Sequence, residues 1–398
     1  MRTRLQLRHL TVLAALLACP LLQAQSAATP SPVNTLVVIQ LAGGNDGLDT
    51  VIPFGDPAYA ALRPTIAPRA SDLIKLDGTL ALHPALAPLL PTWNEGDLAI
   101  ALGVGYPEPN RSHFRSTDIW ETGSSSNEVL SAGWLARLLT SAARPPALFA
   151  DSLILGETQP GPLRGPGMHN ISMDSVDAFI RDAAQIESES GGQNASLQYI
   201  DSVQQDISAA AAELMKIKPS IKEPAVAFPN SALGNQLKTS FQLLAAGLRV
   251  PVIKLTLRGF DLHSDERLAQ EKLLGEFATA VGAFRLNLVQ AGLWNDVLVM
   301  TYSEFGRRVQ ENASNGTDHG TAAPLFILGG TVKGGFYGSQ PSLAASDLDQ
   351  GDMKYALDFR IIYRTIAEGF FGIKDPTLLA AVFPTVTSIL PLFKTSPQ

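Results

Sequence analysis

The sequence has 398 residues, of which 45% are hydrophobic and 17% are charged. That balance is typical of a folded globular protein and excludes a disordered or fibrous chain. The 37 acidic residues outnumber the 30 basic ones, and the net charge of -7 at pH 7 makes nucleic acid and anionic lipid poor partners. For this length we expect one elaborated domain.

Residues 1–24 are predicted to be a secretory signal peptide. Three arginines within the first eight residues precede an uncharged apolar run over 10–22. This run is shorter than the roughly 20 residues of a membrane-spanning helix, and the small residue Ala24 predicts the cleavage site. The mature chain would begin near Gln25 with a net charge of -10, because it loses three basic residues and no acidic one. We expect it in the periplasm or outside the cell, without an integral membrane segment.

The only cysteine, Cys19, lies within the predicted signal. The residues before it also resemble a bacterial lipoprotein signal, so lipid attachment at Cys19 is the alternative to cleavage after Ala24. A mature chain without cysteine has no thiolate nucleophile, no disulfide and no cysteine-ligated zinc. Its chemistry must therefore use oxygen and imidazole groups.

Short runs rich in β-branched residues alternate with longer segments of helical spacing. The expected strands are 36–41, 98–104, 252–257, 297–302 and 325–328, and the expected helices are 84–93, 134–142, 233–248, 267–293 and 355–371. This alternation predicts an α/β fold in which helices cover both faces of a parallel sheet. The polar, alanine-rich segment 174–222 is expected to be a helical insertion with a hinge at 187–192.

Polar motifs occupy the ends of the predicted strands, where ligands bind in open parallel sheets. The candidate metal ligands are Asn45 and Asp46 after the first strand, Asp261 and His263 after 252–257, Glu304 after 297–302, and Asp318 and His319 before 325–328. Carboxylates and imidazoles without thiolates suit zinc, manganese, magnesium or calcium.

Each motif also has a purely structural interpretation. Asn45 and Asp46, followed by glycine, are typical of a turn, and the segment after His263 can cap a helix that begins near Glu266. His319 is harder to explain structurally, because nothing local needs an imidazole between glycines. The occurrence of all these motifs at strand ends favours a functional site.

The segment 107–123 follows the expected strand 98–104 and leads through a proline loop into a helix whose first turn carries Ser112 and His113. A hydroxyl at a helix N-terminus suits a nucleophile or an anion-binding group, and it equally suits an N-cap. Arg111 and Arg115 either hold a phosphate or sulfate group or form salt bridges with neighbouring acids.

Taken in chain order, these motifs are similar to those of the bacterial family catalogued as domain of unknown function 1501, whose members resemble the alkaline phosphatase and sulfatase superfamily. The segments that carry the resemblance are 41–53, 111–123, 259–263, 303–307 and 316–320. The resemblance implies an alkaline-phosphatase-like three-layer sandwich over 33–398, with a largely parallel sheet.

The resemblance also implies roles for individual residues. Asp46, or Asn45 beside it, falls where the superfamily places its first metal-binding aspartate. Asp261 and His263 resemble the central metal-binding pair, but with one intervening residue where the superfamily usually has three. His319 resembles the last metal-binding histidine.

One departure concerns the segment 303–306, which reads Ser-Glu-Phe-Gly where the superfamily has Ser-Asp-His-Gly. Glu304 can replace the aspartate, whereas Phe305 cannot bind a metal. Asp318 is an alternative ligand, and the implied site holds one metal ion or two.

The implied function is an exported metal-dependent hydrolase of phosphate or sulfate esters, with Ser112 as the nucleophile and Arg111 or Arg115 binding the anion. The alternative is a non-catalytic exported binding or assembly protein that keeps the fold with a degenerate metal site. The expected partner is accordingly a small anionic ester or another exported protein.

Overall fold

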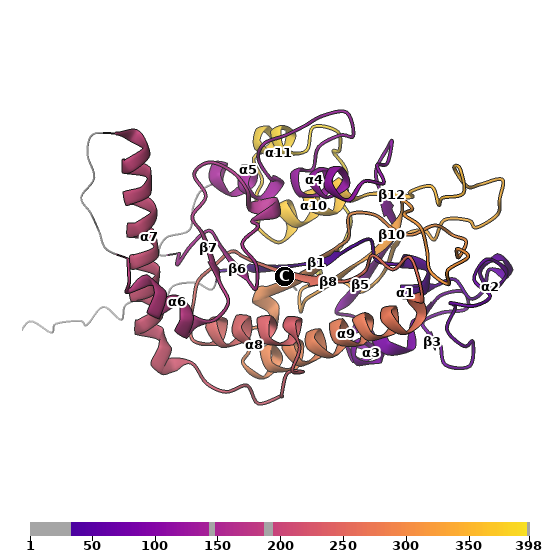
Figure 1. Ribbon diagram of the computed structural model, residues 1–398, viewed down its shortest axis with the longest axis horizontal. Helices are drawn as coiled ribbons and strands as arrows, with labels where there is room; N and C mark the ends of the chain where they lie inside the picture. The colour runs from indigo at the N-terminus through magenta and orange to yellow at the C-terminus, as the bar shows by residue number, and fades with distance from the viewer. Residues whose placement is uncertain (1–32, 143–147, 187–193, 396–398) are drawn as a thin grey trace, which may run out of the picture. The chain divides into compact units, whose positions relative to one another are not determined.

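The computed structural model describes residues 33–142, 148–186 and 194–395, which belong to one structural unit (Figure 1). The predicted signal peptide with Cys19 and the predicted hinge at 187–192 lie outside the described residues. Among the helices that the structure describes, none has the length and apolar character needed to cross a membrane.

A sheet of nine strands forms the central layer. Its strands are, in spatial order, β11 (Gly335–Gly338), β5 (Leu98–Gly105), β10 (Ala323–Leu328), β9 (Val297–Tyr302), β1 (Thr35–Ala42), β8 (Val252–Arg258), β6 (Ser152–Leu155) and β7 (Asn170–Met173), with β12 (Leu357–Asp358) also paired to β5. All adjacent pairs are parallel except those that β10 makes with β5 and β9. The expected strands are therefore present, and the prediction of a largely parallel sheet is confirmed. The strands β6 and β7 were not expected, because each has only four residues and Ser172 interrupts the apolar pattern of β7.

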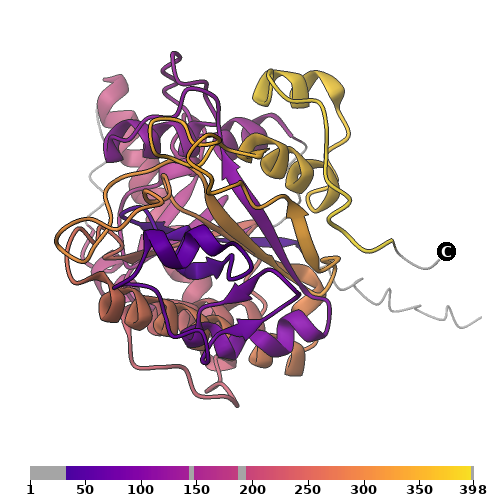
Figure 2. The same ribbon diagram turned by 90° about the vertical axis from the view of Figure 1, so that its right-hand side faces the viewer.

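Strand β1 shows why helices cover both faces of the sheet. Its successive side chains alternate between faces, so that Val37 and Ile39 belong to one hydrophobic core and Leu36 and Val38 to the other. The first core is closed by α3 (Leu90–Asn94), α8 (Ala232–Ala245), α9 (Glu266–Gln290) and the 3-10 helix η1 (Pro84–Leu89). The second is closed by α4 (His113–Thr122), α5 (Trp134–Ser141), α10 (Phe359–Gly369) and α11 (Pro376–Val382). Figures 1 and 2 show these helices on opposite sides of the sheet, which confirms the three-layer α/β prediction.

The remaining elements are short or lie outside these layers. They are α1 (Gly47–Thr50), α2 (Pro57–Leu62), the small sheet of β2 (Val51–Ile52), β4 (Ala81–Leu82) and β3 (Ile74–Lys75), the 3-10 helices η2 (Gly161–Leu163), η3 (Lys218–Ser220) and η4 (Trp294–Asp296), and the helices α6 (Val176–Ala183) and α7 (Ala195–Ile217).

The helix expected over 355–371 begins later than predicted, at Phe359. Residues 357–358 pair with β5 as β12, and the Asp358 carboxylate then caps α10 by accepting a hydrogen bond from Arg360 N. Such a cap starts the helix at the residue that follows it.

The reversed direction of β10 determines where the polar motifs meet. The carboxyl ends of β1, β8, β9 and β5 lie at one edge of the sheet, and the amino end of β10 lies at that same edge because the strand is antiparallel to β9 and β5. A motif that precedes β10 therefore joins motifs that follow the other strands.

Candidate functional site

Three imidazoles converge on one carboxylate at this edge of the sheet. The Nε2 atoms of His263 and His319 lie 3.0 Å and 3.1 Å from Asp261 Oδ1, and His113 Nε2 lies 3.4 Å from Asp261 Oδ2. The two nitrogens His263 Nε2 and His319 Nε2 are themselves 3.0 Å apart. We call these four residues, His113, Asp261, His263 and His319, the histidine cluster.

An oxygen atom faces the opposite ring nitrogen of each histidine. The Nδ1 atom of His113 is 2.8 Å from Glu304 Oε1, and that of His319 is 2.9 Å from the Arg111 carbonyl oxygen. The Nδ1 atom of His263 is 3.4 Å from Asp318 Oδ1. Where the Glu304 and Arg111 oxygens accept a hydrogen bond from Nδ1–H, the neutral rings of His113 and His319 turn the Nε2 lone pair to the centre of the cluster.

This arrangement fits a metal cation. His113 Nε2 is buried with no hydrogen-bond partner among the described residues. Suitable ligand atoms of His113, Asp261 and His319 all lie within 4.8 Å of one another. A set of imidazoles and one carboxylate suits zinc and similar transition metals better than magnesium or calcium, which prefer oxygen ligands.

The buried guanidinium of Arg307 connects the loops that carry the cluster. It donates to the carbonyl oxygens of Gly44 at 2.7 Å, Phe260 at 2.9 Å and Thr317 at 3.0 Å. It also donates to Asp261 Oδ1 at 2.8 Å. Burial alone would raise the pKa of Asp261, but the hydrogen bonds from Arg307 and the cluster outweigh it and lower that pKa to about 2. Asp261 therefore stays ionised at neutral pH.

Two glycines allow the loop after β1 to pass close to the cluster. Gly43 and Gly44 have φ angles of 120° and 80°, which side-chain-bearing residues rarely adopt. A Cβ atom on Gly43 would lie 2.4 Å from Asp261 N, and one on Gly44 would lie 2.4 Å from Phe305 Cε2. The loop thus supports the site through its backbone.

The side chains of Asn45 and Asp46 take part in a different set of contacts. The Asp46 carboxylate forms an ion pair with Arg63 and accepts a hydrogen bond from Leu48 N at 3.1 Å, which caps α1. The Asn45 side chain bonds to Thr50 and accepts from Gln270 Nε2 at 2.9 Å. Together with Asp49 and Glu266, Asp46 and Arg63 form what we call the buried ion cluster, and each of these four residues is at most 2% exposed.

Glu304 and Asp318 lie behind the histidines. Glu304 is buried, and its Oε1 accepts from Gly43 N at 2.9 Å besides facing His113. This contact raises the pKa of His113 above its ordinary value, against the opposing effect of burial. Asp318 is more exposed and faces His263. Both carboxylates are therefore placed to orient imidazoles.

Phe305 closes one side of the histidine cluster. Its ring centroid lies 4.8 Å from that of His113 and 4.6 Å from that of His319. The side chain is only 2% exposed. At the position where the resemblance implied a metal ligand, this chain has an apolar ring packed against two candidate ligands.

Ser112 occupies the N-cap position of α4, but its side chain makes no capping hydrogen bond. Instead, Asn110 Oδ1 accepts from Ser112 N at 2.8 Å, and the serine remains exposed. Ser112 thus directly precedes His113 in the chain, and its side chain lacks the capping contact that a purely structural role predicts.

The two candidate anion-binding arginines are engaged with other groups. Arg115 pairs with Asp118 and donates to the Ser125 and Ser126 carbonyl oxygens at 3.1 Å, which ties the following loop to α4. Arg111 pairs with Asp352. Its contact with the histidine cluster is made by its backbone oxygen.

His113 and Arg307 lie within motifs that the sequence shows, but the sequence alone predicts no role for either residue. The argument that pointed to His319, an imidazole at a strand end without a local structural need, applies equally to His113. His113 was not predicted as a ligand because the functional role in this segment was assigned to the neighbouring Ser112. No sequence signal identifies Arg307, since its partners are backbone oxygens from distant loops.

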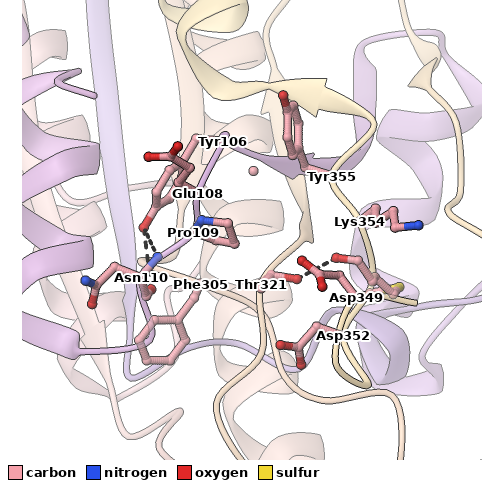
Figure 3. Close-up of a pocket in the computed structure, with 12 residues that line it drawn as sticks. Tyr106, Glu108, Pro109, Asn110, Phe305, Thr321, Asp349, Asp352, Lys354 and Tyr355 are labelled. Carbon is pink, nitrogen blue, oxygen red and sulfur yellow. Dashed lines mark hydrogen bonds between the residues drawn. The ribbon is translucent and has the colours of Figure 1, made fainter. Parts of the chain in front are cut away.

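Two cavities border the site. One, of about 540 Å³, is lined by His113, Glu304, Phe114, Lys254, Arg258 and Arg164 among others. The other, of about 390 Å³, lies beside Phe305 and is shown in Figure 3. Volumes in this range are common for small-molecule sites, at roughly 300–1,000 Å³.

Comparison with solved structures finds similar chains of low sequence identity. A lipoteichoic acid synthase from Listeria monocytogenes is 10% identical with a TM-score of 0.38, covering 86% of this chain and 73% of that one. The sulfatase PsFucS1 from a Pseudoalteromonas species is 12% identical with a TM-score of 0.36, covering 86% and 68%. The C-terminal periplasmic domain of EptC from Escherichia coli, in complex with zinc, is 10% identical with a TM-score of 0.32, covering 75% and 73%.

No curated protein sequence matches the chain. A family model described as "Protein of unknown function (DUF1501)" matches residues 33–356, which include the histidine cluster, Ser112, Glu304 and Arg307. The chain therefore belongs to the DUF1501 family.

Proposed function

We propose that the chain is an exported metal-dependent hydrolase of phosphate or sulfate esters. The histidine cluster is its metal site, with one ion rather than two, and Ser112 is its nucleophile. The observation that carries the proposal is the convergence of the three Nε2 atoms on Asp261. Imidazoles and a carboxylate would hold zinc, and ligand atoms of His113, Asp261 and His319 lie within 4.8 Å of one another.

When bound, the metal would stabilise negative charge on the ester and on the attacking oxygen. The residues of the chain would hold and orient it. Glu304 and the Arg111 carbonyl fix the ring orientation of His113 and His319. The first turn of α4 presents backbone N–H groups and the positive end of the helix dipole to an anion beside Ser112.

The proposed reaction is a substitution at phosphorus or sulfur in two steps. The Ser112 hydroxyl loses its proton and its Oγ bonds to the phosphorus or sulfur atom, while the bond to the alcohol oxygen breaks and that oxygen takes up a proton. Water then breaks the bond to Ser112 Oγ, which releases phosphate or sulfate and restores the hydroxyl. No oxidant or second substrate is needed.

A second candidate is a non-catalytic exported binding protein that uses the same metal site. Phe305 favours this candidate, because its ring fills a position where a further ligand would be needed for a second metal ion. The ion pair between Asp46 and Arg63 also favours the binding protein, because it occupies a carboxylate that a second metal ion would need. Both candidate functions predict that the chain binds metal, and only the hydrolase predicts that it hydrolyses an ester.

Metal analysis of the purified mature protein tests the proposal first. We expect about one zinc ion per chain after incubation with zinc and removal of excess, together with hydrolysis of 4-nitrophenyl phosphate or 4-nitrophenyl sulfate. His319→Ala should lose both. His169→Ala is the matched control, because His169 forms an exposed ion pair with Asp206. A wild-type protein that binds no divalent metal would overturn both candidates.

The variant Ser112→Ala separates the two candidates. We expect it to keep the metal and to lose ester hydrolysis by several orders of magnitude, because the nucleophile is gone and the ligands remain. Hydrolysis at the wild-type rate would remove Ser112 from the mechanism. A wild-type protein that holds metal but hydrolyses neither ester would favour the binding protein.

The mass of the mature N-terminus in the native host tests export. A chain that begins near Gln25 supports the proposal, and a lipid-modified Cys19 supports export by the alternative route. An intact Met1 would contradict both.

A further inference from the structure

The cavity of about 390 Å³ beside Phe305 combines aromatic rings with carboxylates. Tyr106 and Phe305 lie on one side of it, and Tyr355 lies on the other (Figure 3). We call this cavity the aromatic–acidic pocket, and its acidic lining residues are Glu108, Asp349 and Asp352.

Asp352 has one carboxylate oxygen without a hydrogen bond at this pocket. The residue is only 1% exposed. Its Oδ2 pairs with Arg111, whereas its Oδ1 accepts no hydrogen bond from any described residue. Arg308 Nε lies 3.9 Å from that oxygen, beyond hydrogen-bond distance. A buried carboxylate oxygen without a donor favours a ligand that brings a donor or a positive charge.

The acidic side chains of the lining also favour a cation. Glu108 and Asp349 line the pocket besides Asp352, whose charge is paired with Arg111, and Lys354 is the basic side chain of the lining. In Figure 3 the Lys354 side chain extends away from the other labelled residues. Aromatic rings attract an organic ammonium group through their negative faces, and neighbouring carboxylates add to that attraction.

The pocket borders the proposed metal site. Phe305 lines the pocket while its ring packs against His113 and His319. Asn110 also lines the pocket, and it binds the backbone of Ser112. A ligand whose ester group reacts at Ser112 can therefore place its organic group in the pocket.

We infer that the aromatic–acidic pocket binds the alcohol portion of the substrate and that this alcohol carries an alkylammonium group. The substrate class is then the phosphate or sulfate esters of choline-like amino alcohols. This inference rests on the proposed function for its ester chemistry. The pocket itself makes a separate prediction about cation binding.

Choline and its uncharged isostere 3,3-dimethyl-1-butanol test the pocket without any reaction. The two molecules have nearly the same shape and differ in charge. In calorimetric titrations of the full mature protein, we expect choline to bind with a Kd at least about tenfold lower, because only choline gains the attraction of the rings and carboxylates. Equal binding, or no binding of choline, would overturn the inference.

Variants at exposed positions of the pocket locate the bound cation. Tyr355 is 39% exposed and Asp349 is also exposed, so both can be changed with little risk to folding. We expect Tyr355→Ala and Asp349→Asn each to weaken choline binding roughly threefold or more. Asp347→Asn is the control, because Asp347 is exposed and does not line the pocket. An equal loss in the control would place the bound choline elsewhere and overturn the inference.

Hydrolysis separates failure of the inference from failure of the proposed function. We expect choline phosphate, or choline sulfate, to be a better substrate than the corresponding ester of 3,3-dimethyl-1-butanol by about tenfold in kcat/KM. Equal hydrolysis of both esters would overturn the inference and leave the hydrolase intact. Preferential choline binding without hydrolysis of any ester would support the cation pocket and overturn the hydrolase.

Discussion

The histidine cluster and the buried ion cluster both include residues from the segment that follows β8, yet they satisfy their polar groups differently. In the buried ion cluster Arg63 pairs with both Asp46 and Asp49, and all the members are at most 2% exposed. In the histidine cluster the side-chain exposure ranges from 24% for His319 to 47% for Asp261. In the buried ion cluster an internal cation pairs with the carboxylates, and in the histidine cluster His113 Nε2 has no hydrogen-bond partner among the described residues.

The comparison separates stability from function. Charges that are buried and paired inside the protein hold loops together, and removal of one partner leaves an uncompensated charge. Half-exposed groups with open lone pairs contribute little until a ligand arrives. Variants in the buried ion cluster should therefore change the free energy of unfolding, and variants in the histidine cluster should change metal binding.

The largest expected effect on stability follows from Arg63→Met. The substitution removes the cation and leaves Asp46 and Asp49 buried without it, so we expect the free energy of unfolding to fall by about 3–5 kcal/mol. Chemical denaturation measures this change. Arg69→Met, at an exposed arginine nearby, should change it by no more than about 0.5 kcal/mol. A loss below about 1 kcal/mol for Arg63→Met would show that the ion cluster does not stabilise the fold.

The largest expected effect on metal binding follows from His113→Ala and His319→Ala. Each removes a ligand, so the zinc Kd should rise by more than the roughly 100-fold that loss of a supporting partner can cost. In the presence of chelator the melting temperature should change little, since the empty site contributes little packing. If chelator leaves the wild-type melt unchanged while His319→Ala lowers it, the histidines are structural.

A smaller effect is expected from Glu304→Gln. Glu304 is buried and accepts from His113 Nδ1 at 2.8 Å, so replacing its charge should weaken zinc binding by about 10–100-fold without removing a ligand. Asp318→Asn provides the comparison, because Asp318 is 59% exposed and lies 3.4 Å from His263. A larger loss for Asp318→Asn than for Glu304→Gln would reverse the assigned roles.

The smallest effect concerns the pH dependence of stability. Burial, and then the nearby Asp46 charge, raise the pKa of Glu266 well above its ordinary value of 4.5. Above pH 4.5 the unfolded chain releases this proton and the folded chain keeps it. The free energy of unfolding should therefore fall as pH rises, by at most about 1.4 kcal/mol per pH unit for this group. Glu266→Gln should flatten the plot of the free energy of unfolding against pH between pH 4.5 and about 10, measured by denaturation. An unchanged slope of that plot would contradict a protonated Glu266 in the folded chain.

Hydrophobic pattern alone was enough to locate the main strands, because buried parallel strands are continuous apolar runs with recognisable ends. The expected strand 297–302 coincides with β9. Strand direction is not encoded in that pattern, so the reversal of β10 could not be predicted. The early part of the helix expected over 355–371 was wrong for a similar reason, since residues 357–358 pair with a distant strand.

Part of the candidate site was also expected from the sequence. Asp261 and His263 directly follow a strand that the apolar pattern locates, whereas His319 joins them only because β10 is reversed. The contacts of Asp46 could not be predicted, because they depend on Arg63, a residue 17 positions away that belongs to no motif. Whether a loop carboxylate faces a ligand or a buried cation is decided by tertiary packing.

The guanidinium of Arg307 connects residues that are far apart in the chain, since its partner Gly44 lies 263 positions earlier. The histidines likewise meet only after β8, β1, β9, β10 and β5 have paired, because His263 follows β8, His319 precedes β10 and His113 follows β5. An unfolded chain therefore has no preformed metal site, and metal binding must accompany or follow folding. If the proposed site binds metal, the compartment in which the chain folds would select the ion, because the metals available there would compete for the newly formed ligands.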